Sequence, residues 1–437
     1  MTTHLRGRLS RRRALQLVAA GAAAWLAAPL GKLGTARPWA APASYRVGVG
    51  NLPDPYAATQ RAVAASGEWP AAAIAGRTVM IKPNLVTAAT PDTGTTTDPQ
   101  VVRALVDLAL DSGAGQVSIV ESGPHGPNFS PCGYDFFASY DPRVSLVDLD
   151  SLPTRLVRVP GGMAYRILYM PAPVLDTNVV FISAGKLKTH GDSAVSLAMK
   201  NLFGLPPHRF YRLPGNPSQA RFAMHYRSVS QTIIDLNLAR RIDFAVIDGV
   251  WGMEGDGPFN GSPVEMDVVL AGRNALAVDR VALQAMGISQ TAVQHLRYAS
   301  GKGLGPADTA SITLAGDPLP TRSFAPALPR PDIDMPTCQP ASFSPGLGQS
   351  TSISYVIDRP GRTTVEALRT SELVSFVEHV RTVQDWTDVA AGLNTLAWDG
   401  RDDGGNVLPA GRYGVRVRAE ATDRVLDTFA INWVQVA

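Results

Sequence analysis

The sequence predicts an α/β body with a largely parallel or mixed sheet, joined to a small C-terminal all-β sandwich. Three observations lead to this fold class. Strand-like and helix-like stretches alternate over residues 45–316, which is typical of an α/β sheet. Residues 318–345 hold eight prolines in 28 positions, as a stiff linker would. Beyond them the hydrophobic period changes to two, which indicates strands.

The body begins with an apolar run at residues 78–81 that ends in Lys82-Pro83-Asn84, the pattern of a buried strand entering a loop. Asp98 and Pro99 together form a helix start, because Asp caps the first turn and Pro is tolerated there. Gly113 is expected to end that helix. Further strands are expected at 116–121, 179–182, 244–247 and 268–270, and further helices at 193–203, 228–239 and 276–286.

Short alternating runs follow the proline-rich stretch, and turn residues separate them. They occupy residues 352–357, 413–418 and 429–436, and they predict a small immunoglobulin-like sandwich. The expected organisation is a signal peptide at 1–43, the α/β domain at 44–317, the linker at 318–345 and the sandwich at 346–437.

The N-terminus has the pattern of an export signal. Ser10-Arg11-Arg12-Arg13-Ala14-Leu15-Gln16 contains the paired arginines of a twin-arginine address, and an apolar run too short for a stable membrane span follows. Ala41-Pro42-Ala43 offers a small-residue cleavage site before Ser44. We expect the twin-arginine translocase to be a partner and the location to be periplasmic, cell-surface or extracellular. The alternative is an ordinary secretory signal or an uncleaved anchor.

Charge and cysteine content exclude some classes. The formal net charge is +3, but residues 1–43 hold seven basic residues and no acid. Removing these seven from 40 basic residues leaves 33 against 37 acidic ones, a charge of −4, which gives no case for a nucleic-acid partner. Two cysteines, Cys132 and Cys338, without a C-x-x-C motif exclude an iron–sulfur cluster within this chain. Whether they form a disulfide stays open.

Two stretches resemble known families. Near the C-terminus, Leu396-Ala397-Trp398-Asp399-Gly400-Arg401-Asp402 and Pro409-Ala410-Gly411-Arg412-Tyr413 resemble the immunoglobulin-like domain of the flagellar hook-capping protein. This resemblance implies a structural or adhesive module. Trp398 and Tyr413 are expected to be its core aromatic residues.

The body, over about residues 45–316, resembles the domain of unknown function 362 family. The family's usual His is replaced here by Asp98, and its reaction is not established, so the resemblance points to a site but to no substrate. The motifs behind it are Ile81-Lys82-Pro83-Asn84-Leu85, Thr95-Thr96-Thr97-Asp98-Pro99, Lys186-Leu187-Lys188-Thr189-His190, Ala198-Met199-Lys200-Asn201-Leu202-Phe203-Gly204, Asp248-Gly249, Met253-Glu254-Gly255-Asp256-Gly257-Pro258, Gly261 and Ala277-Val278-Asp279.

Lysine placement is the main chemical clue. The chain has 40 Lys and Arg residues, of which only six are Lys, and four of the five outside the signal lie in these motifs. Lys differs from Arg in that it is a compact charge, loses its proton when buried and can form a Schiff base. The alternative is chance placement or lysine stems that pack on apolar surface.

These residues predict a cleft for a small anionic substrate or cofactor at the carboxyl edge of the sheet, where α/β folds bind ligands. The free N–H groups of the helix expected after His190 would also face an anion. The expected catalytic residues are His190, Lys188 and Lys200, and the expected ligand-binding residues are Lys82, Asn84, Lys186 and Asn201.

An acidic, glycine-rich loop is expected after the strand at 244–247. Asp248, Glu254 and His225 are candidate ligands for a divalent metal, although a tight turn explains the acids equally well. The cofactor is undetermined, a divalent metal or an organic molecule. An exported enzyme is the favoured function. The alternative is a non-catalytic surface or extracellular binding protein that uses the sandwich as a display module.

Overall fold

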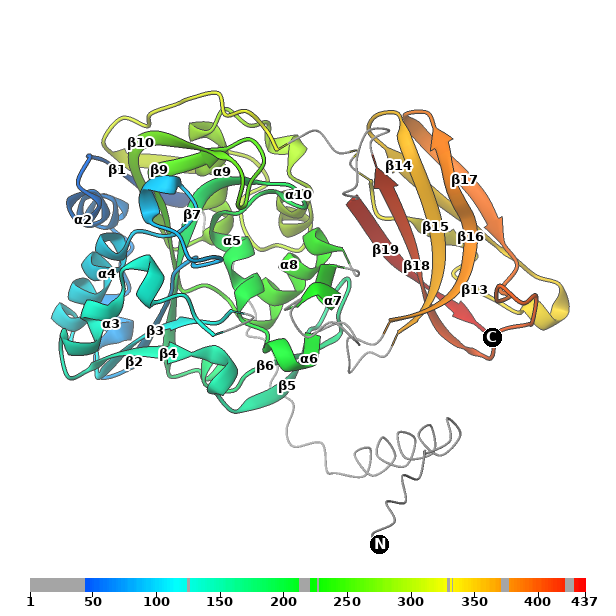
Figure 1. The fold of residues 1–437 in the computed structure, drawn as a ribbon, viewed down its shortest axis with the longest axis horizontal. Helices are drawn as coiled ribbons and strands as arrows, with labels where there is room; N and C mark the ends of the chain where they lie inside the picture. Colours follow the sequence, from blue (N-terminus) through cyan, green and yellow to red (C-terminus); the bar gives the residue numbers. More distant parts are fainter. Residues whose placement is uncertain are drawn as a thin grey trace, which may run out of the picture. The chain divides into compact units, whose positions relative to one another are not determined.

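The structure is a computed structural model. It describes residues 44–123, 126–211, 221–225, 228–327, 331, 333–370, 377–420 and 428–437. The expected signal peptide therefore lies outside the described residues. Within them, an α/β body and an all-β sandwich follow one another along the chain (Figure 1).

The described part of the body is built on a nine-stranded mixed sheet. Its strand order is β11-β1-β10-β9-β7-β2-β3-β4, with β8 paired to β7 alone. The strands are β1 Tyr45–Asn51, β2 Thr78–Lys82, β3 Gln116–Glu121, β4 Val144–Asp148, β7 Val179–His190, β8 Ala194–Val195, β9 Phe244–Glu254, β10 Ser262–Gly272 and β11 Ile312–Gly316.

Strand direction divides the sheet. Five adjacent strands are parallel to one another: β4, β3, β2, β7 and β9. The next strand, β10, is antiparallel to both β9 and β1. The parallel half places the carboxyl ends of β2, β3 and β7 side by side. This edge is where ligands bind in open α/β sheets. A separate antiparallel pair is formed by β5 Thr154–Arg158 and β6 Ile167–Pro171.

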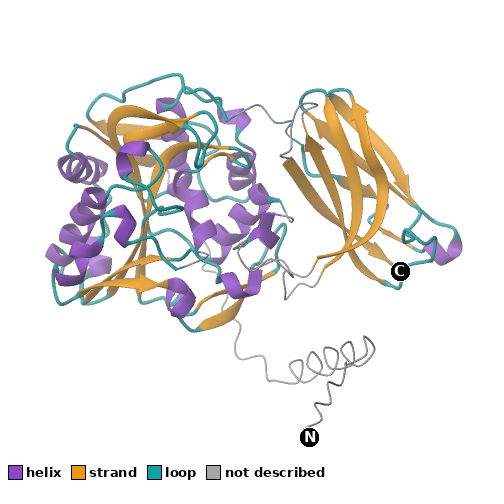
Figure 2. Ribbon diagram, viewed as in Figure 1, coloured by secondary structure: helices purple, strands orange, loops and turns teal. Residues whose placement is uncertain are grey.

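Helices cover both faces of the sheet (Figure 2). One hydrophobic core lies under α2, α3 and α4, and the other lies under α5, α8, α9 and α10. The helices are α2 Pro55–Ser66, α3 Ala71–Ile74, α4 Pro99–Asp111, α5 Leu197–Asn201, α6 His208–Tyr211, α7 Phe222–His225, α8 Val229–Ala239, α9 Ala275–Ala285 and α10 Gln294–Gly301.

Side-chain alternation assigns each strand residue to one of these faces. In β2, Val79 and Ile81 belong to the core under α4, whereas Met80 belongs to the core under α5. Lys82 shares the parity of Met80 and therefore points toward α5. In β7, Ile182 points toward α4, and by the same parity so does Lys186.

Most expected elements are confirmed. Asp98 caps α4, because its side chain accepts a hydrogen bond from the N–H of Gln100 at 2.7 Å. The helix expected at 193–203 is wrong in its first part. Residues 194–195 form β8, and α5 spans only Leu197–Asn201 before a short 3₁₀ turn at Leu202–Gly204. Hydrogen bonding of β8 to the end of β7 explains the difference.

Two strands are longer than expected. Strand β7 continues to His190 and β9 continues to Glu254, so Lys186, Lys188 and Asp248 lie in strands rather than in loops. Polar motifs follow the apolar runs in the sequence, so the hydrophobic pattern alone predicted strands that end too early. Pairing of Lys188 with Met253 shows that the ladder extends through them, with a register shift after Lys186.

The C-terminal domain is a sandwich of two sheets around one core that includes Trp398 and Tyr413. One sheet has the order β12-β14-β17 and the other β13-β19-β18-β15-β16. The strands are β12 Thr337–Gln339, β13 Ser342–Phe343, β14 Thr351–Ile357, β15 Gly361–Thr370, β16 Val377–Val389, β17 Gly392–Trp398, β18 Gly411–Glu420 and β19 Thr428–Val436.

The proline-rich stretch contributes to both domains. Phe324 is buried in the core of the body, and its N–H donates to the carbonyl of Met286 at 2.9 Å. Strands β12 and β13 fall in the stretch expected to be linker and pair within the sandwich. Cys132 and Cys338 are both free and buried. Among the helices that the structure describes, none is both long and apolar enough to cross a membrane.

Candidate functional site

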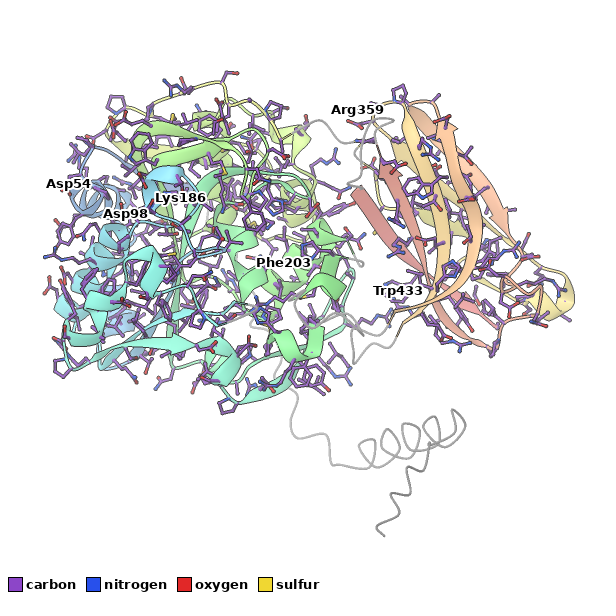
Figure 3. The ribbon with its side chains drawn as sticks, viewed as in Figure 1. Asp54, Asp98, Lys186, Phe203, Arg359 and Trp433 are labelled. Atoms are coloured by element: carbon purple, nitrogen blue, oxygen red, sulfur yellow. The ribbon has the colours of Figure 1, made fainter. Side chains whose placement is uncertain are left out.

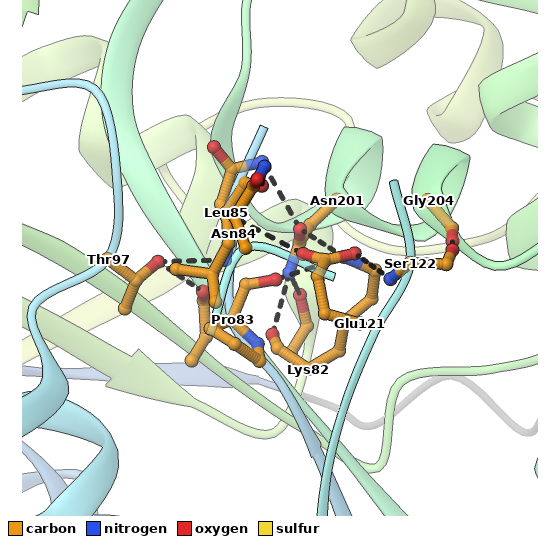
Figure 4. Close-up of polar contacts among 12 residues, drawn as sticks. Lys82, Pro83, Asn84, Leu85, Thr97, Glu121, Ser122, Asn201 and Gly204 are labelled. Carbon is orange, nitrogen blue, oxygen red and sulfur yellow. Dashed lines mark hydrogen bonds and ion pairs between the residues drawn. The ribbon is translucent and has the colours of Figure 1, made fainter. Parts of the chain in front are cut away.

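Lys82 ends β2 and lies in a buried ion pair at the carboxyl edge of the sheet (Figure 4). Its Nζ donates to both carboxylate oxygens of Glu121, each at 2.8 Å, and to the carbonyl of Pro83 at 3.0 Å. Glu121 ends the neighbouring strand β3. Burial lowers the pKa of Lys82, and the charge of Glu121 opposes that shift.

Two asparagines complete this group, which we call the Lys82 cluster: Lys82, Asn84, Glu121 and Asn201. Asn201 Nδ2 donates to the carbonyl of Lys82 at 2.8 Å, and Asn201 Oδ1 accepts from Lys82 Nζ at 3.3 Å. Asn84 Nδ2 donates to the same Oδ1 at 3.4 Å. The buried Oδ1 of Asn84 has no hydrogen-bond partner among the described residues, so a ligand donor would satisfy it.

Lys186 lies on the opposite face of the sheet, toward α4, and Figure 3 labels it beside Asp98, which caps that helix. Its Nζ forms a buried ion pair with Asp248 Oδ2 at 2.8 Å, and the N–H of Asp98 donates to the same oxygen at 2.8 Å. Burial, followed by the charge of Asp248, raises the pKa of Asp98 to about 6. The ion pair with Asp248 already supplies a counter-charge for Lys186 within the protein.

Lys188 has a buried amine whose hydrogen-bond partners among the described residues are all neutral oxygens. Its Nζ donates to the carbonyl of Thr95 at 2.7 Å and weakly to that of Pro258 at 3.5 Å. Its pKa falls well below the ordinary value because of burial, then because of the positive charges of Lys200 and Lys186. Lys82 adds to this effect. Lys188 shares the parity of Lys186 in β7 and therefore the α4 face, whereas Lys82 points toward α5, so the four lysines do not line one face of the sheet.

Lys200 is half-buried on α5, and its Nζ lies 5.5 Å from the centre of the Phe203 ring. Burial, the largest cause, and the charge of Lys82 together lower its pKa to about 8, although the charge of Asp192 opposes the shift. The His225 ring packs against Phe203 with centroids 5.0 Å apart. Burial lowers the pKa of His225, which keeps this imidazole neutral at neutral pH.

The N-terminus of α5 is already occupied by a carboxylate of the protein. Asp279 Oδ1 accepts from the N–H of Ala198 at 2.8 Å, and its Oδ2 accepts from that of Met199 at 3.0 Å. The expectation that this helix end would face a ligand anion is therefore wrong. Asp279, from α9, instead fixes the short helix that presents Lys200 and Asn201.

His190 is buried at the end of β7, and its Nδ1 accepts from the N–H of Asp192 at 3.0 Å. The neutral ring therefore holds its proton on Nε2. The three metal candidates have separate partners. Asp248 faces Lys186, Glu254 accepts from the N–H of Ala325 at 2.8 Å, and His225 lies 3.9 Å from Asp192. In the described part of the chain, no group of three His, Cys, Asp or Glu side chains has the arrangement of a metal site.

Sequence reasoning missed Glu121 and Arg221, and it named Asp279 only within a family motif, without a role. Arg221 is buried, and it donates to the carbonyls of Pro206 at 2.5 Å and Gly204 at 2.8 Å and to Ser122 Oγ. Burial lowers its pKa to about 10. A carboxylate that ends an apolar strand was the available signal for Glu121. Arg221 gave none, because arginine is frequent throughout this chain.

The fold and this edge define an α/β protein with a cation-rich polar site. Two family descriptions match the chain: the domain of unknown function (DUF362) at residues 79–284 and the FlgD Ig-like domain at residues 378–423. Both resemblances expected from the sequence are thereby confirmed. The lysine motifs and Asp279 all fall within the first match.

A curated relative and two solved structures are also similar to the chain. The thylakoid-associated protein sll1697 of Synechocystis sp. is 26% identical over 235 residues, which cover 53% of this chain and 70% of that protein. A β-glucosidase from intestinal bacteria aligns with 83% of this chain at 12% identity and a TM-score of 0.17. One from Erythrobacter marinus aligns with 90% of it at 10% identity and a TM-score of 0.16. The chain spans about half the length of these two structures. At such scores neither bears on fold or function.

Proposed function

We propose that this protein is an exported enzyme that binds a small anionic substrate or cofactor at the lysine-rich carboxyl edge of its α/β sheet. The observation that supports the proposal is Lys188. This residue is 1% exposed, and no carboxylate within the described residues forms an ion pair with it. Its lowered pKa favours the neutral amine, and a bound anion would supply a counter-charge and favour the ammonium form.

The local charge balance supports the same proposal. The cations at this edge are Lys82, Lys186, Lys188, Lys200 and Arg221. Glu121 and Asp248 neutralise two of them through direct ion pairs. Asp192 and Asp150 offset the charges of Lys200 and Arg221 in part, so Lys188 is left without an ion-pair partner among the described residues, and a small anion with a carboxylate or phosphate group would supply its counter-charge. His190 and His225, both at this edge, are the groups suited to move a proton at neutral pH.

Calorimetric titration of the mature chain with inorganic phosphate, pyrophosphate and oxalate tests the proposal. We expect at least one of them to bind, and we expect Lys188→Met to lose ten-fold or more in affinity while its circular dichroism is unchanged. Lys302→Met is the matched control, because this exposed lysine donates only to the carbonyl of Gly161 at 2.8 Å. If none of the three anions binds, or if a folded Lys188→Met variant binds them unchanged, the proposal fails.

Export by the twin-arginine translocase is the second part of the proposal. It is supported by Arg11 and Arg12 in the expected signal and by a body whose buried ion pairs need a folded chain. Replacing both arginines with Lys should abolish export of a reporter that is active only when it is exported folded. Replacing Arg37, which lies outside the motif, should leave export intact. Export of the double variant at the wild-type level would contradict this route.

A further inference from the structure

His208 and Asp150 form a pair above the carboxyl end of β4, apart from the lysines. Asp150 lies in the short turn Leu149–Ser151 that follows β4, and its Oδ1 accepts from the N–H of His208 at 2.7 Å. Its Oδ2 contacts His208 Nδ1. The carbonyl of Asp150 in turn accepts from Arg209 Nη1 at 2.8 Å. These contacts hold the imidazole ring in one orientation, with Nδ1 toward the carboxylate.

This orientation decides which ring nitrogen of His208 carries the proton. The contact with Asp150 places a proton on Nδ1, because a carboxylate only accepts hydrogen bonds. His208 is 6% exposed, and its buried Nε2 has no hydrogen-bond partner among the described residues, so a second proton there would lack an acceptor. Burial lowers the pKa of His208, with the charge of Arg221 in the same direction and the hydrogen bond to Asp150 against it. Nε2 therefore keeps a lone pair that accepts a hydrogen bond.

Arg221 supplies hydrogen-bond donors close to this lone pair. Its Nε donates to the carbonyl of Pro206, two residues before His208, at 2.5 Å. Its Nη2 donates to the carbonyl of Gly204 at 2.8 Å and to Ser122 Oγ, and Figure 4 labels both of these residues. These acceptors are all neutral, and Nη1 has no hydrogen bond within the described part of the chain. A buried guanidinium thus lies beside a buried acceptor, and each has unused bonding capacity.

We infer that His208 and Arg221 bind a protonated oxyanion, such as hydrogen phosphate or the monoanion of a phosphate ester. The P–OH group would donate to His208 Nε2, and a charged oxygen would accept from Arg221 Nη1. Sulfate has the same shape but carries no proton at neutral pH, so it would place a second lone pair against Nε2. This inference goes beyond the proposed function, because the two residues share no hydrogen-bond partner with Lys188.

Comparison of phosphate with sulfate tests the inference on the full mature chain. Calorimetric titration at pH 7.5 should show phosphate binding at least about tenfold more tightly than sulfate, because a site built around a ligand hydroxyl rejects an analogue that lacks it. Arg221→Gln removes the charge but leaves the acceptor, so it should weaken both anions and keep phosphate the preferred one.

Asp150→Asn changes the position of the proton on His208. An asparagine amide donates to Nδ1, so the ring proton would move to Nε2, which would then be a donor. We expect the preference for phosphate to fall at least about tenfold, with sulfate bound as well as phosphate or better. Asp148→Asn is the matched control. Asp148 affects His208 and Arg221 through its charge, but its side chain accepts from the N–H of Asp150 at 2.9 Å, so the preference should persist.

Nitrogen-15 NMR of the histidine-labelled wild-type protein needs no variant to fold. His208 should have a protonated Nδ1 and an unprotonated Nε2, whose signal shifts when phosphate is added but not when sulfate is added. A protonated Nε2, equal or absent binding of the two anions, or a folded Asp150→Asn variant with the wild-type preference would overturn the inference. Lys188→Met should retain the preference. If that variant loses all phosphate binding, this inference fails while the proposed function stands.

Discussion

The α/β body and the sandwich treat charged side chains differently. The body buries Lys82, Lys186 and Lys188 at its sheet edge, and it also buries Asp235 and Asp279 under its helices. In the described part of the sandwich, Arg416 is the one charged side chain in the buried class, and it pairs with Glu366 at 2.7 Å.

This difference has a physical meaning. Well-packed apolar residues stabilise a fold at least as well as buried ion pairs do, so stability alone does not require the charges in the body. The sandwich is stabilised in this way, by a core of apolar and aromatic residues around Trp398. Buried, perturbed ionisable groups that gather at a ligand-binding edge instead indicate chemistry. The contrast supports placing the proposed ligand site in the body rather than in the sandwich.

The largest expected effect is from breaking the Lys82–Glu121 pair. Glu121→Ala leaves the Lys82 ammonium buried without its counter-charge, and we expect the free energy of unfolding to fall by about 3–5 kcal/mol. Urea unfolding followed by circular dichroism measures this loss. The double variant Lys82→Met, Glu121→Leu is the control and should lie much closer to wild type, since it removes both charges. A loss below about 1 kcal/mol in Glu121→Ala would mean that Lys82 is not truly desolvated.

Removing the charge of Asp98 should raise the free energy of unfolding, by less than Glu121→Ala lowers it. Because its pKa is raised from 3.8 to about 6, its contribution to stability is present below pH 4 and is lost as the pH rises through 6. Asp98→Asn keeps the cap on α4 and cannot ionise. We expect it to stabilise the protein by about 1–2 kcal/mol at pH 7.5 and to have little effect at pH 4. Thermal unfolding at the two pH values checks this, and an equal effect at both would contradict it.

On the sandwich, an exposed ion pair should matter little. Arg359 pairs with Asp358 at 2.8 Å, with side chains 48% and 39% exposed. Arg359→Ala should change the free energy of unfolding by less than about 0.5 kcal/mol, because solvent screens such pairs. Arg416→Met, which leaves Glu366 unpaired in a buried setting, is the comparison and should cost more. If the two variants cost the same, exposure does not decide what the loss of an ion pair costs in the sandwich.

The smallest effect is expected from removing the sandwich entirely. Its core is separate from both cores of the body, so cutting the chain near Pro329 should leave two pieces that fold. We expect the thermal midpoint of the body to shift by less than about 2 °C. Differential scanning calorimetry of both pieces and of the uncut chain measures it. Failure of either piece to fold would contradict their independence.

Local sequence patterns predicted the fold well where a helix or strand is marked by a clear cap or by an unbroken apolar run. Asp98-Pro99 marked the start of α4, and the apolar run at 78–81 marked β2. The strands β7 and β9 were cut short because their last residues are polar and pair through backbone bonds that a hydrophobic pattern does not register. The extra strand β8 was hidden within a helix-like stretch for a related reason.

The candidate site was predictable in its residues but not in its pairings. The rarity of Lys indicated Lys82, Lys186, Lys188 and Lys200. The counter-charges are distant in sequence, since Glu121 lies 39 residues from Lys82 and Asp248 lies 62 residues from Lys186. Only the sheet order brings these positions together, and a single sequence does not contain that order explicitly. The distinction between occupied lysines and the unbonded Lys200 is likewise a product of tertiary structure.

Asp279 has a consequence for when the surroundings of Lys200 can exist. The five residues of α5 are too few to remain helical alone, and a carboxylate from α9, about 80 positions later, holds their first turn. A peptide cut from around Lys200 would therefore contain an ordinary, fully hydrated lysine. The setting of Lys200 is in this sense a late product of folding, absent until α9 has docked against α5.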